Sequence, residues 1–438
     1  MIEFEGVKQH GPATVIERPR ERAILVGVDR PGQEWSLSSS MAELERLAWT
    51  AGADMVASTT QRLDSPNPRT FVGSGKAEEI ASLARSYAAD VVIFDDELTP
   101  SQQSNLEGIV GKDVKVIDRT ALILDIFALH ATSKEGRLQV RLAQNQYLYP
   151  RLRGMWAHLA SNRMGGGVGS RFGEGESQLE VDRRLVRQRI TSIRRELADL
   201  SKKRDLQRKN RRESGVYKIA LAGYTNAGKS SLLNALTGSE VLSYDKLFAT
   251  LDSTTRQLTL PEGREVTLTD TVGFIQKLPT TLVEAFKSTL DEINGADLVL
   301  HVVDASDANH ERQIDTVNMV LEQIGAEKIG RIEVFNKMDL LSEGELEALK
   351  VRHEQAVLTS TVDGSGIDEL IQRIALTASA QDELMKVLIP YDRGDLVSLA
   401  HTRCAVLNEE YTDCGTYLVV RASAQAAAQL KPFVSNEG

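Results

Sequence analysis

The sequence predicts an α/β protein in four parts: an N-terminal parallel α/β domain, a long antiparallel helical hairpin, a second parallel α/β domain and a small C-terminal α/β appendage. Two stretches in which apolar runs of strand length alternate with helical patterns predict the two parallel sheets. Between them lies a stretch without strand signals, whose apolar residues repeat at helical spacing. We expect the four parts at residues 1–134, 135–213, 214–378 and 379–438.

The N-terminal domain is predicted from the alternation within residues 22–130. Strands are expected at 23–28, 54–59, 90–95 and 113–118, and helices at 40–53, 76–89 and from about Ser101. The segment FVGSGK (71–76) resembles a phosphate loop, but its glycines stand too close together and Ala77 replaces the usual Ser or Thr. A tight turn before the second helix is the simpler interpretation, and a second nucleotide site there stays open.

The central stretch is predicted to form two antiparallel helices that pack along an apolar seam. Spacing of 4-3-4-3 falls on Leu138, Leu142, Asn145, Tyr149 and Leu152 in the first helix, and on Val186, Ile190, Ile193, Leu197 and Leu200 in the second. Pro150 is expected to kink or end the first helix, because proline removes a main-chain hydrogen bond. Residues 162–177 are rich in glycine and lack apolar periodicity, so a mobile loop is expected there.

A basic segment stands within an otherwise acidic chain. The net charge is −10, yet residues 183–212 carry thirteen Lys or Arg against three Asp or Glu, so the rest is near −20. Such a segment favours a polyanionic partner, and together with the glycine-rich loop it is suited to contact RNA phosphates. The candidate RNA contacts are Arg171, Arg183, Arg184, Arg187 and Arg194. A solvated coiled-coil face is the alternative interpretation.

A phosphate-binding loop is predicted at the start of the second α/β domain. The pattern G-x-x-x-x-G-K-[ST] lies between the apolar strand 217–223 and a helix, as the motif requires. Main-chain N–H groups suit a β-phosphate, Lys229 can reach the β- and γ-phosphates, and the Ser230 hydroxyl suits Mg²⁺. The loop residues expected to bind the nucleotide are Gly223, Tyr224, Thr225, Asn226, Ala227, Gly228, Lys229, Ser230 and Ser231.

Two further motifs, each at the end of an expected strand, identify the nucleotide. Asp270, Thr271, Val272 and Gly273 form D-x-x-G, and Asn336, Lys337, Met338 and Asp339 form N-K-x-D. In the first, the carboxylate suits Mg²⁺ and the glycine lets a main-chain N–H approach the γ-phosphate. In the second, the Asp339 carboxylate can accept N1–H and the exocyclic amine of guanine, a donor pair that adenine lacks. The sequence therefore predicts a P-loop, Ras-like GTPase domain that binds GTP with Mg²⁺, with Ser360 and Thr361 near the base edge.

The segment FATLD lies between the phosphate loop and D-x-x-G, where a segment ordered by the nucleotide is required. Its residues Phe248, Ala249, Thr250, Leu251 and Asp252 are expected near GTP. Thr250 is the expected second protein ligand of Mg²⁺, with Thr254 and Thr255 as alternatives. Phe274 follows D-x-x-G where Ras-type enzymes place a water-orienting glutamine. A phenyl ring cannot orient water, so the catalytic residue stays unknown: another group positions the water or intrinsic turnover is slow.

Together these motifs resemble those of the HflX family of translational GTPases. The resemblance extends to FVGSGKAEEI (71–80), YPRLRGMW (149–156), GGGVGSR (165–171) and GESQLEVDRR (175–184), and it covers most of residues 22–375. Two departures are Glu174, which stands with an extra residue where the family has proline, and Ser360-Thr361 in place of Ser-Ala. The resemblance implies GTP hydrolysis coupled to the large ribosomal subunit and its rRNA, with splitting or rescue of stalled ribosomes under stress.

Other classes of function find less support in the sequence. No apolar run is long enough to span a membrane, the first residues do not resemble a signal peptide, and Cys404 and Cys414 make no disulfide framework. We expect a cytoplasmic monomer, with peripheral membrane association left open. The alternative function is a GTP-controlled switch in RNA modification or ribosome assembly, with little intrinsic hydrolysis. A modifying chemistry would need a constellation within residues 1–150, where His10 and His130 are isolated.

Overall fold

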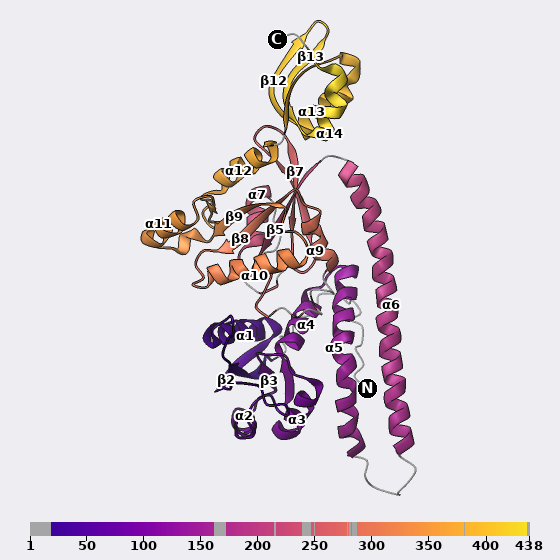
Figure 1. The fold of residues 1–438 in the computed structure, drawn as a ribbon, viewed down its shortest axis with the longest axis vertical. Helices are drawn as coiled ribbons and strands as arrows, with labels where there is room; N and C mark the ends of the chain where they lie inside the picture. The colour runs from indigo at the N-terminus through magenta and orange to yellow at the C-terminus, as the bar shows by residue number, and fades with distance from the viewer. Residues whose placement is uncertain are drawn as a thin grey trace. The chain divides into compact units, whose positions relative to one another are not determined.

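The computed structural model describes residues 19–161, 172–213, 216–238, 247–248, 250–277, 279, 282, 287–380 and 382–435. The chain divides into two compact units, one up to Arg119 and the other from Thr120 onward. Both units contain sheets covered by helices, as expected of an α/β protein (Figure 1). Within these ranges, no helix is long and apolar enough to cross a membrane.

The first unit is a parallel sheet with helices packed on it. Its strands are β1 (Glu21–Asp29), β2 (Ala53–Arg62), β3 (Val91–Phe94) and β4 (Lys115–Asp118), in the order β2-β1-β3-β4. Its helices are α1 (Leu37–Ala51), α2 (Ser74–Ser86) and α3 (Pro100–Val110). Strand β3 is buried along its whole length, which explains why its sequence VVIF is entirely apolar. The parallel sheet predicted from the strand–helix alternation is confirmed.

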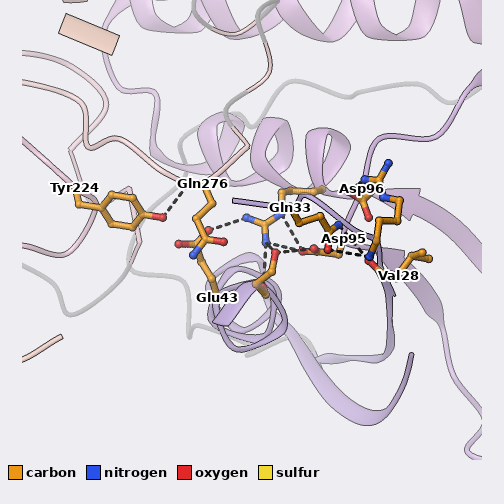
Figure 2. A network of polar contacts seen from close by, with 10 residues as sticks. Val28, Gln33, Glu43, Asp95, Asp96, Tyr224 and Gln276 are labelled. Carbon is orange, nitrogen blue, oxygen red and sulfur yellow. Dashed lines mark hydrogen bonds and ion pairs between the residues drawn. The ribbon is translucent and has the colours of Figure 1, made fainter. Parts of the chain in front are cut away.

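A buried ion cluster lies where β3 and β4 end, and Figure 2 shows its carboxylates Glu43 and Asp95. The guanidinium of Arg119 lies 2.7 Å from Glu43 Oε1 and 2.5 Å from Asp95 Oδ1. Ser40 Oγ donates to the second carboxylate oxygen of Asp95 at 2.6 Å. The three charged side chains are at most 2% exposed, so one guanidinium compensates two carboxylates that are removed from water.

We expect Arg119→Met to lower the free energy of unfolding by about 3 kcal/mol, because it leaves two buried carboxylates without their cation. Arg46→Met, at an exposed position of α1, is the matched control and should change this free energy by less than about 0.5 kcal/mol. Urea unfolding, followed by the fluorescence of the buried Trp35 in the same unit, compares the two variants. Equal unfolding midpoints for both would show that the cluster does not stabilise the unit.

The second unit contains the predicted helical hairpin, formed by α5 (Lys134–Ser161) and α6 (Phe172–Glu213), which run side by side after α4 (Arg119–His130) (Figure 1). Leu138 and Leu142 of α5 pack with Ile193 of α6, and Ile190, Leu197 and Leu200 lie against this cluster. Further along α5, Tyr149 lies against Arg183 and Arg187, earlier in α6. The helices are therefore antiparallel, and the predicted seam is confirmed at these residues.

Two details of the hairpin differ from the prediction. Helix α5 continues through Pro150 to Ser161, so of the two expected outcomes, a kink or an end, the end is wrong and the kink stays a prediction. Packing against α6 offsets the single main-chain hydrogen bond that proline removes. Helix α6 begins at Phe172, so residues 172–177 of the predicted loop are helical, while 162–171 lie outside the described residues.

A larger sheet follows the hairpin. Its strands are β5 (Tyr217–Gly223), β6 (Thr254–Thr259), β7 (Glu265–Asp270), β8 (Leu298–Asp304), β9 (Gly330–Asn336) and β10 (Val357–Leu358), in the order β10-β9-β8-β5-β7-β6. In the described residues all neighbours pair in parallel apart from β6 and β7, which are antiparallel. Helices α7 (Lys229–Thr237), α9 (Lys287–Asn294), α10 (His310–Gln323), α11 (Glu343–Arg352) and α12 (Ile367–Ser379) complete this α/β fold. The strands expected at 217–223, 266–273, 296–305 and 331–339 are confirmed with slightly different ends.

The last part of the chain is an antiparallel sheet of β11 (Glu383–Ile389), β12 (Ala405–Thr412) and β13 (Gly415–Ala422), in the order β11-β13-β12. Helices α13 (Gly394–Arg403) and α14 (Ala424–Leu430) pack on it and share its apolar core (Figure 1). The predicted α/β appendage is therefore present. Strand β11 was not expected, because the adjacent apolar residues of ELMKVLI hide the alternation between its buried and exposed faces.

Candidate nucleotide-binding site

Parallel strands bring the predicted motifs to one edge of the larger sheet. The phosphate loop follows β5, D-x-x-G begins at the last residue of β7, and N-K-x-D begins at the last residue of β9. Because the carboxyl ends of parallel strands meet at one edge, these distant segments share a site. Thr225 N donates to Phe274 O at 2.7 Å, and Phe274 N to Gly223 O at 3.1 Å. Figure 2 shows a further tie, in which Gln276 N donates to the Tyr224 hydroxyl at 2.7 Å.

Lys229, which is predicted to bind phosphate, is buried in the phosphate loop. Its ammonium donates to the carbonyl oxygens of Tyr224 at 2.9 Å and Gly223 at 3.2 Å. Burial lowers the pKa of Lys229 to about 8, although the carboxylate of Asp270 opposes this shift. A polyphosphate in the loop would supply further negative charge and would favour the protonated ammonium.

Gly273 passes so close to the phosphate loop that a side chain would not fit. A Cβ atom at this position would lie 2.7 Å from Thr225 Cα and 3.0 Å from Lys229 Nζ. The main chain after Asp270 can approach the loop only because residue 273 is glycine. The approach of the Gly273 N–H to a γ-phosphate, which the D-x-x-G motif predicts, stays a prediction.

Three side chains with oxygen atoms that can bind a metal lie together where Mg²⁺ is predicted. Ser230 Oγ lies 2.7 Å from Thr250 Oγ1 and donates to Asp270 Oδ2 at 2.6 Å. The second carboxylate oxygen of Asp270 is buried and makes no hydrogen bond within the described part of the chain. Burial raises the pKa of Asp270, against the opposing effects of Lys229 and Ser230. Two hydroxyls beside a buried carboxylate with one unused oxygen fit Mg²⁺, which prefers oxygen ligands.

The alternative threonines, Thr254 and Thr255, lie on β6. Thr255 Oγ1 lies 3.0 Å from Thr269 Oγ1 on β7, and Thr254 pairs with Asp270 across the same two strands. Among the three candidates, Thr250 is the one whose hydroxyl reaches Ser230. The geometry therefore favours Thr250 as the second protein ligand.

The N-K-x-D motif is attached to the phosphate loop. Asn336 Nδ2 donates to Ala227 O at 3.0 Å, and Lys337 Nζ lies 2.6 Å from Asp304 Oδ2. Asp339 is exposed in the short 3-10 turn Met338–Leu340, as a base-reading carboxylate must be. The neighbouring Ser360 is buried and accepts from Val362 N at 3.3 Å, which orders its loop, whereas Thr361 is partly exposed.

The ring of Phe274 is buried in the protein core. It is 2% exposed and belongs to a cluster that includes Ala220, Leu290 and Val299. The ring therefore takes no part in positioning water. The group that orients the attacking water stays unassigned.

The FATLD segment contacts helices α4 and α5 in addition to the phosphate loop. Phe248 N donates to Thr225 Oγ1 at 3.0 Å, while its ring lies edge-on to Phe127 of α4 with centroids 4.6 Å apart. Asp252 accepts hydrogen bonds from Thr132 and Ser133 at the start of α5. The role of Asp252 in GTP binding stays a prediction, and Ala249 lies outside the described residues.

Sequence patterns do not predict the part that Thr132 and Ser133 play. Threonine and serine are typical residues at the start of a helix. Ser133 caps α5, because its Oγ accepts a hydrogen bond from Gly136 N at 2.8 Å. Their partner Asp252 lies 120 and 119 positions away, and no motif links the two segments. Only the tertiary structure brings the two segments together.

The arginines predicted to contact RNA differ in their surroundings. Arg183 and Arg187 flank the ring of Tyr149 on α5, each with its guanidinium carbon 5.6 Å from the ring centroid, so both also join the two helices. Arg184 and Arg194 are exposed on α6, as are Arg189 and Arg195. Arg171 lies outside the described residues. Arg187 is exposed as well, so the exposed arginines that do not lie against Tyr149 are the better candidates to contact a partner.

The FVGSGK segment (71–76) runs from the turn before α2 into the first turn of that helix. Lys76 Nζ lies 2.8 Å from a Glu79 oxygen and donates to Thr59 Oγ1 at 3.1 Å. Gly73 N donates to Gln61 Oε1 at 2.9 Å. Protein groups therefore already bind the lysine and the amide that a phosphate loop would present to its ligand. This favours a tight turn before the helix over a second nucleotide site.

Comparison with known families gives three consecutive matches along the chain. A model described as GTP-binding GTPase N-terminal matches residues 38–128, and one described as GTP-binding GTPase Middle Region matches residues 130–211. A model described as 50S ribosome-binding GTPase matches residues 218–337. The matched segments cover most of the first sheet, most of the hairpin and most of the larger sheet.

Relatives named GTPase HflX are similar over most or nearly all of the chain. The GTPase HflX of Caldanaerobacter subterraneus subsp. tengcongensis is 44% identical over 420 residues, which cover 96% of this chain and 95% of the relative. The GTPase HflX of Escherichia coli (strain K12) is 42% identical over 378 residues, which cover 86% and 88%. The GTPase HflX of Flavobacterium psychrophilum is 48% identical over 320 residues, which cover 73% and 76%.

Proposed function

The chain belongs to the HflX family of GTPases and hydrolyses GTP to GDP and phosphate, and from that premise we propose that hydrolysis is coupled to binding of the large ribosomal subunit. The cellular task that we propose is the splitting or rescue of stalled ribosomes under stress, in the cytoplasm. The GTP and GDP states of the FATLD segment would alternate during this cycle.

One observation carries the proposed mechanism: the oxygens of Ser230, Thr250 and Asp270 meet beside the phosphate loop, with Ser230 Oγ within 2.7 Å of both partners. In the proposed site Ser230 and Thr250 hold Mg²⁺, which when bound neutralises charge that develops on the phosphates. Lys229 binds the β- and γ-phosphates and Asp339 selects guanine. The remaining proposed contacts are the other residues of 223–231, 248–252, 270–273 and 336–338, with Ser360 and Thr361.

The ribosomal partner is supported by two independent features. The exposed arginines of α6 form part of a segment of thirteen basic and three acidic residues in a chain whose net charge is −10. The family model that matches residues 218–337 is described as a 50S ribosome-binding GTPase. Phosphate contacts from such a helix would bind rRNA with little dependence on sequence.

We expect the four-fold variant Arg184→Gln, Arg189→Gln, Arg194→Gln and Arg195→Gln to bind large subunits more weakly and with less dependence on salt. Each arginine that contacts a phosphate adds up to ~0.7–0.9 to the slope of log affinity against log salt, so the slope should fall by up to about 3. Sedimentation with large subunits and a non-hydrolysable GTP analogue, repeated across salt concentrations, measures this slope.

A matched control removes the same charge from exposed positions of the GTPase domain: Arg312→Gln, Lys328→Gln, Lys350→Gln and Arg373→Gln. This control should bind subunits as the wild type does. If the α6 variant also bound like wild type, with an unchanged slope, α6 would be a solvated helix. The ribosome-facing surface would then lie elsewhere.

A second candidate function is favoured by the burial of Phe274 in the core. A GTPase without a water-orienting side chain after D-x-x-G can act as a slow switch in ribosome assembly or RNA modification. The two candidates differ in whether the large subunit accelerates turnover.

A further inference from the structure

Asp252, two residues after Thr250, lies at the first turn of α5. Its Oδ2 accepts from Thr132 N at 2.9 Å, from Thr132 Oγ1 at 2.7 Å and from Ser133 N at 2.7 Å, and its Oδ1 accepts from Ser133 Oγ. Ser133 Oγ in turn accepts from Gly136 N and caps the helix. One carboxylate thus receives four hydrogen bonds from two adjacent residues, at the end of a helix where negative charge is favoured.

The first turn of α5 is shaped to admit this carboxylate. A Cβ atom on Gly136 would overlap Asp252 Oδ1, so any larger residue would push Asp252 away. Burial alone would raise the pKa of Asp252, but the hydrogen bonds from Ser133 and Thr132 outweigh burial and lower the pKa. Hydrogen bonds to a carboxylate are among the stronger ones in proteins, so this contact can hold the segment in place.

A second contact holds the other end of the same segment. The Phe248 ring is 2% exposed and lies edge-on to Phe127 of α4, at 4.6 Å between centroids. Thr250 stands between these two attachments, with its hydroxyl 2.7 Å from Ser230 Oγ. The segment that carries a Mg²⁺ ligand is thus fixed on both sides by the α4–α5 corner.

We propose that residues 127–136 are an anchor, within the chain, for the Mg²⁺-binding segment, and that Asp252 is a positioning residue for GTP hydrolysis. With Asp252 held on α5, the Thr250 hydroxyl is presented to the metal before the ion binds, and less order has to be gained on binding. Linkage requires the reverse effect as well: GTP and Mg²⁺ must strengthen the start of the α5–α6 hairpin. This role depends on Thr250 as a Mg²⁺ ligand, which is part of the proposed function.

The test uses full-length Asp252→Asn, Ser133→Ala and the double variant. Asp252→Asn should raise the Mg²⁺ concentration for half-maximal GTP turnover about ten-fold, because it weakens hydrogen bonds to a charged group. Affinity for GDP should fall less than affinity for a non-hydrolysable GTP analogue with Mg²⁺, because the segment is ordered by Mg²⁺ and the third phosphate. The double variant should resemble Asp252→Asn alone, since both substitutions break one contact. Ser253→Ala, at the exposed neighbouring position, should change neither quantity.

An unchanged Mg²⁺ requirement in Asp252→Asn would overturn the anchor, and so would strictly additive effects of the two substitutions. Thr250→Ala separates this failure from that of the metal site. If Thr250→Ala raises the Mg²⁺ requirement and Asp252→Asn does not, only the anchor is wrong. If neither variant raises it, Thr250 is not a ligand and the metal assignment also fails.

Hydrogen exchange gives a readout that a simple helix cap would not change. In the wild type, amides of residues 132–138 should exchange more slowly with a non-hydrolysable GTP analogue and Mg²⁺ than with GDP. In Asp252→Asn this difference should disappear. Equal exchange with both nucleotides in the wild type would reduce Asp252 to a structural cap and contradict the proposal.

Discussion

Replacing Lys229 by alanine is expected to lower GTP turnover by roughly 10²–10³-fold and to weaken nucleotide binding, because the variant loses a positive charge aimed at the transferring phosphate. The fold should persist, since in the part of the chain that the structure describes the ammonium donates hydrogen bonds to the loop carbonyls of Gly223 and Tyr224. Binding of a fluorescent GTP analogue, together with turnover of GTP, measures both effects.

Lys76→Ala is the matched control, because Lys76 belongs to the other glycine-containing lysine segment and is paired with Glu79. Turnover and GTP affinity should match the wild type in this variant. Full turnover in Lys229→Ala, or its loss in Lys76→Ala, would mean that the nucleotide does not occupy the loop after β5.

Replacing Asp339 by asparagine is expected to weaken GTP binding roughly 100-fold and to admit xanthine nucleotides. The carboxylate is expected to accept two charge-assisted hydrogen bonds from guanine, and their loss costs on the order of 3 kcal/mol. An amide instead presents a donor, which suits the oxygen that xanthine carries in place of the guanine amine.

Competition between GTP, ATP and xanthosine triphosphate for the variant measures this change in selectivity. Glu343→Gln is the control, because it removes the same charge at a nearby exposed position, the first residue of α11. It should leave selectivity unaltered. An Asp339→Asn protein that still preferred GTP by the wild-type margin would remove the argument that this motif reads the base.

Sequence patterns predicted the nucleotide site because its chemistry is local. Strands β5 and β8 are buried almost throughout, so they appear as apolar runs, and the motifs stand where such runs end. Each residue that is expected to contact phosphate lies within a short motif, and the turn that carries the motif sets its spacing. The arrangement of three motifs at one sheet edge then follows from parallel pairing alone.

Features that depend on tertiary contacts could not be predicted from the sequence. Pro150 was expected to kink or end the first helix, and α5, packed against α6, continues past it to Ser161. The four hydrogen bonds at Asp252 join segments 120 positions apart, and neither segment alone indicates the other. The environment of Arg183 and Arg187 depends likewise on a tyrosine in the facing helix.

Hydrolysis of GTP under multiple-turnover conditions, with and without purified large ribosomal subunits, tests the coupling of GTPase and ribosome most directly. We predict slow turnover by the protein alone and acceleration by roughly ten-fold or more with subunits, because a partner must supply what Phe274 does not. The four-fold α6 variant should keep the slow basal rate and lose the acceleration. Equal rates with and without subunits, at concentrations where sedimentation shows binding, would contradict the coupling and favour a slow assembly switch.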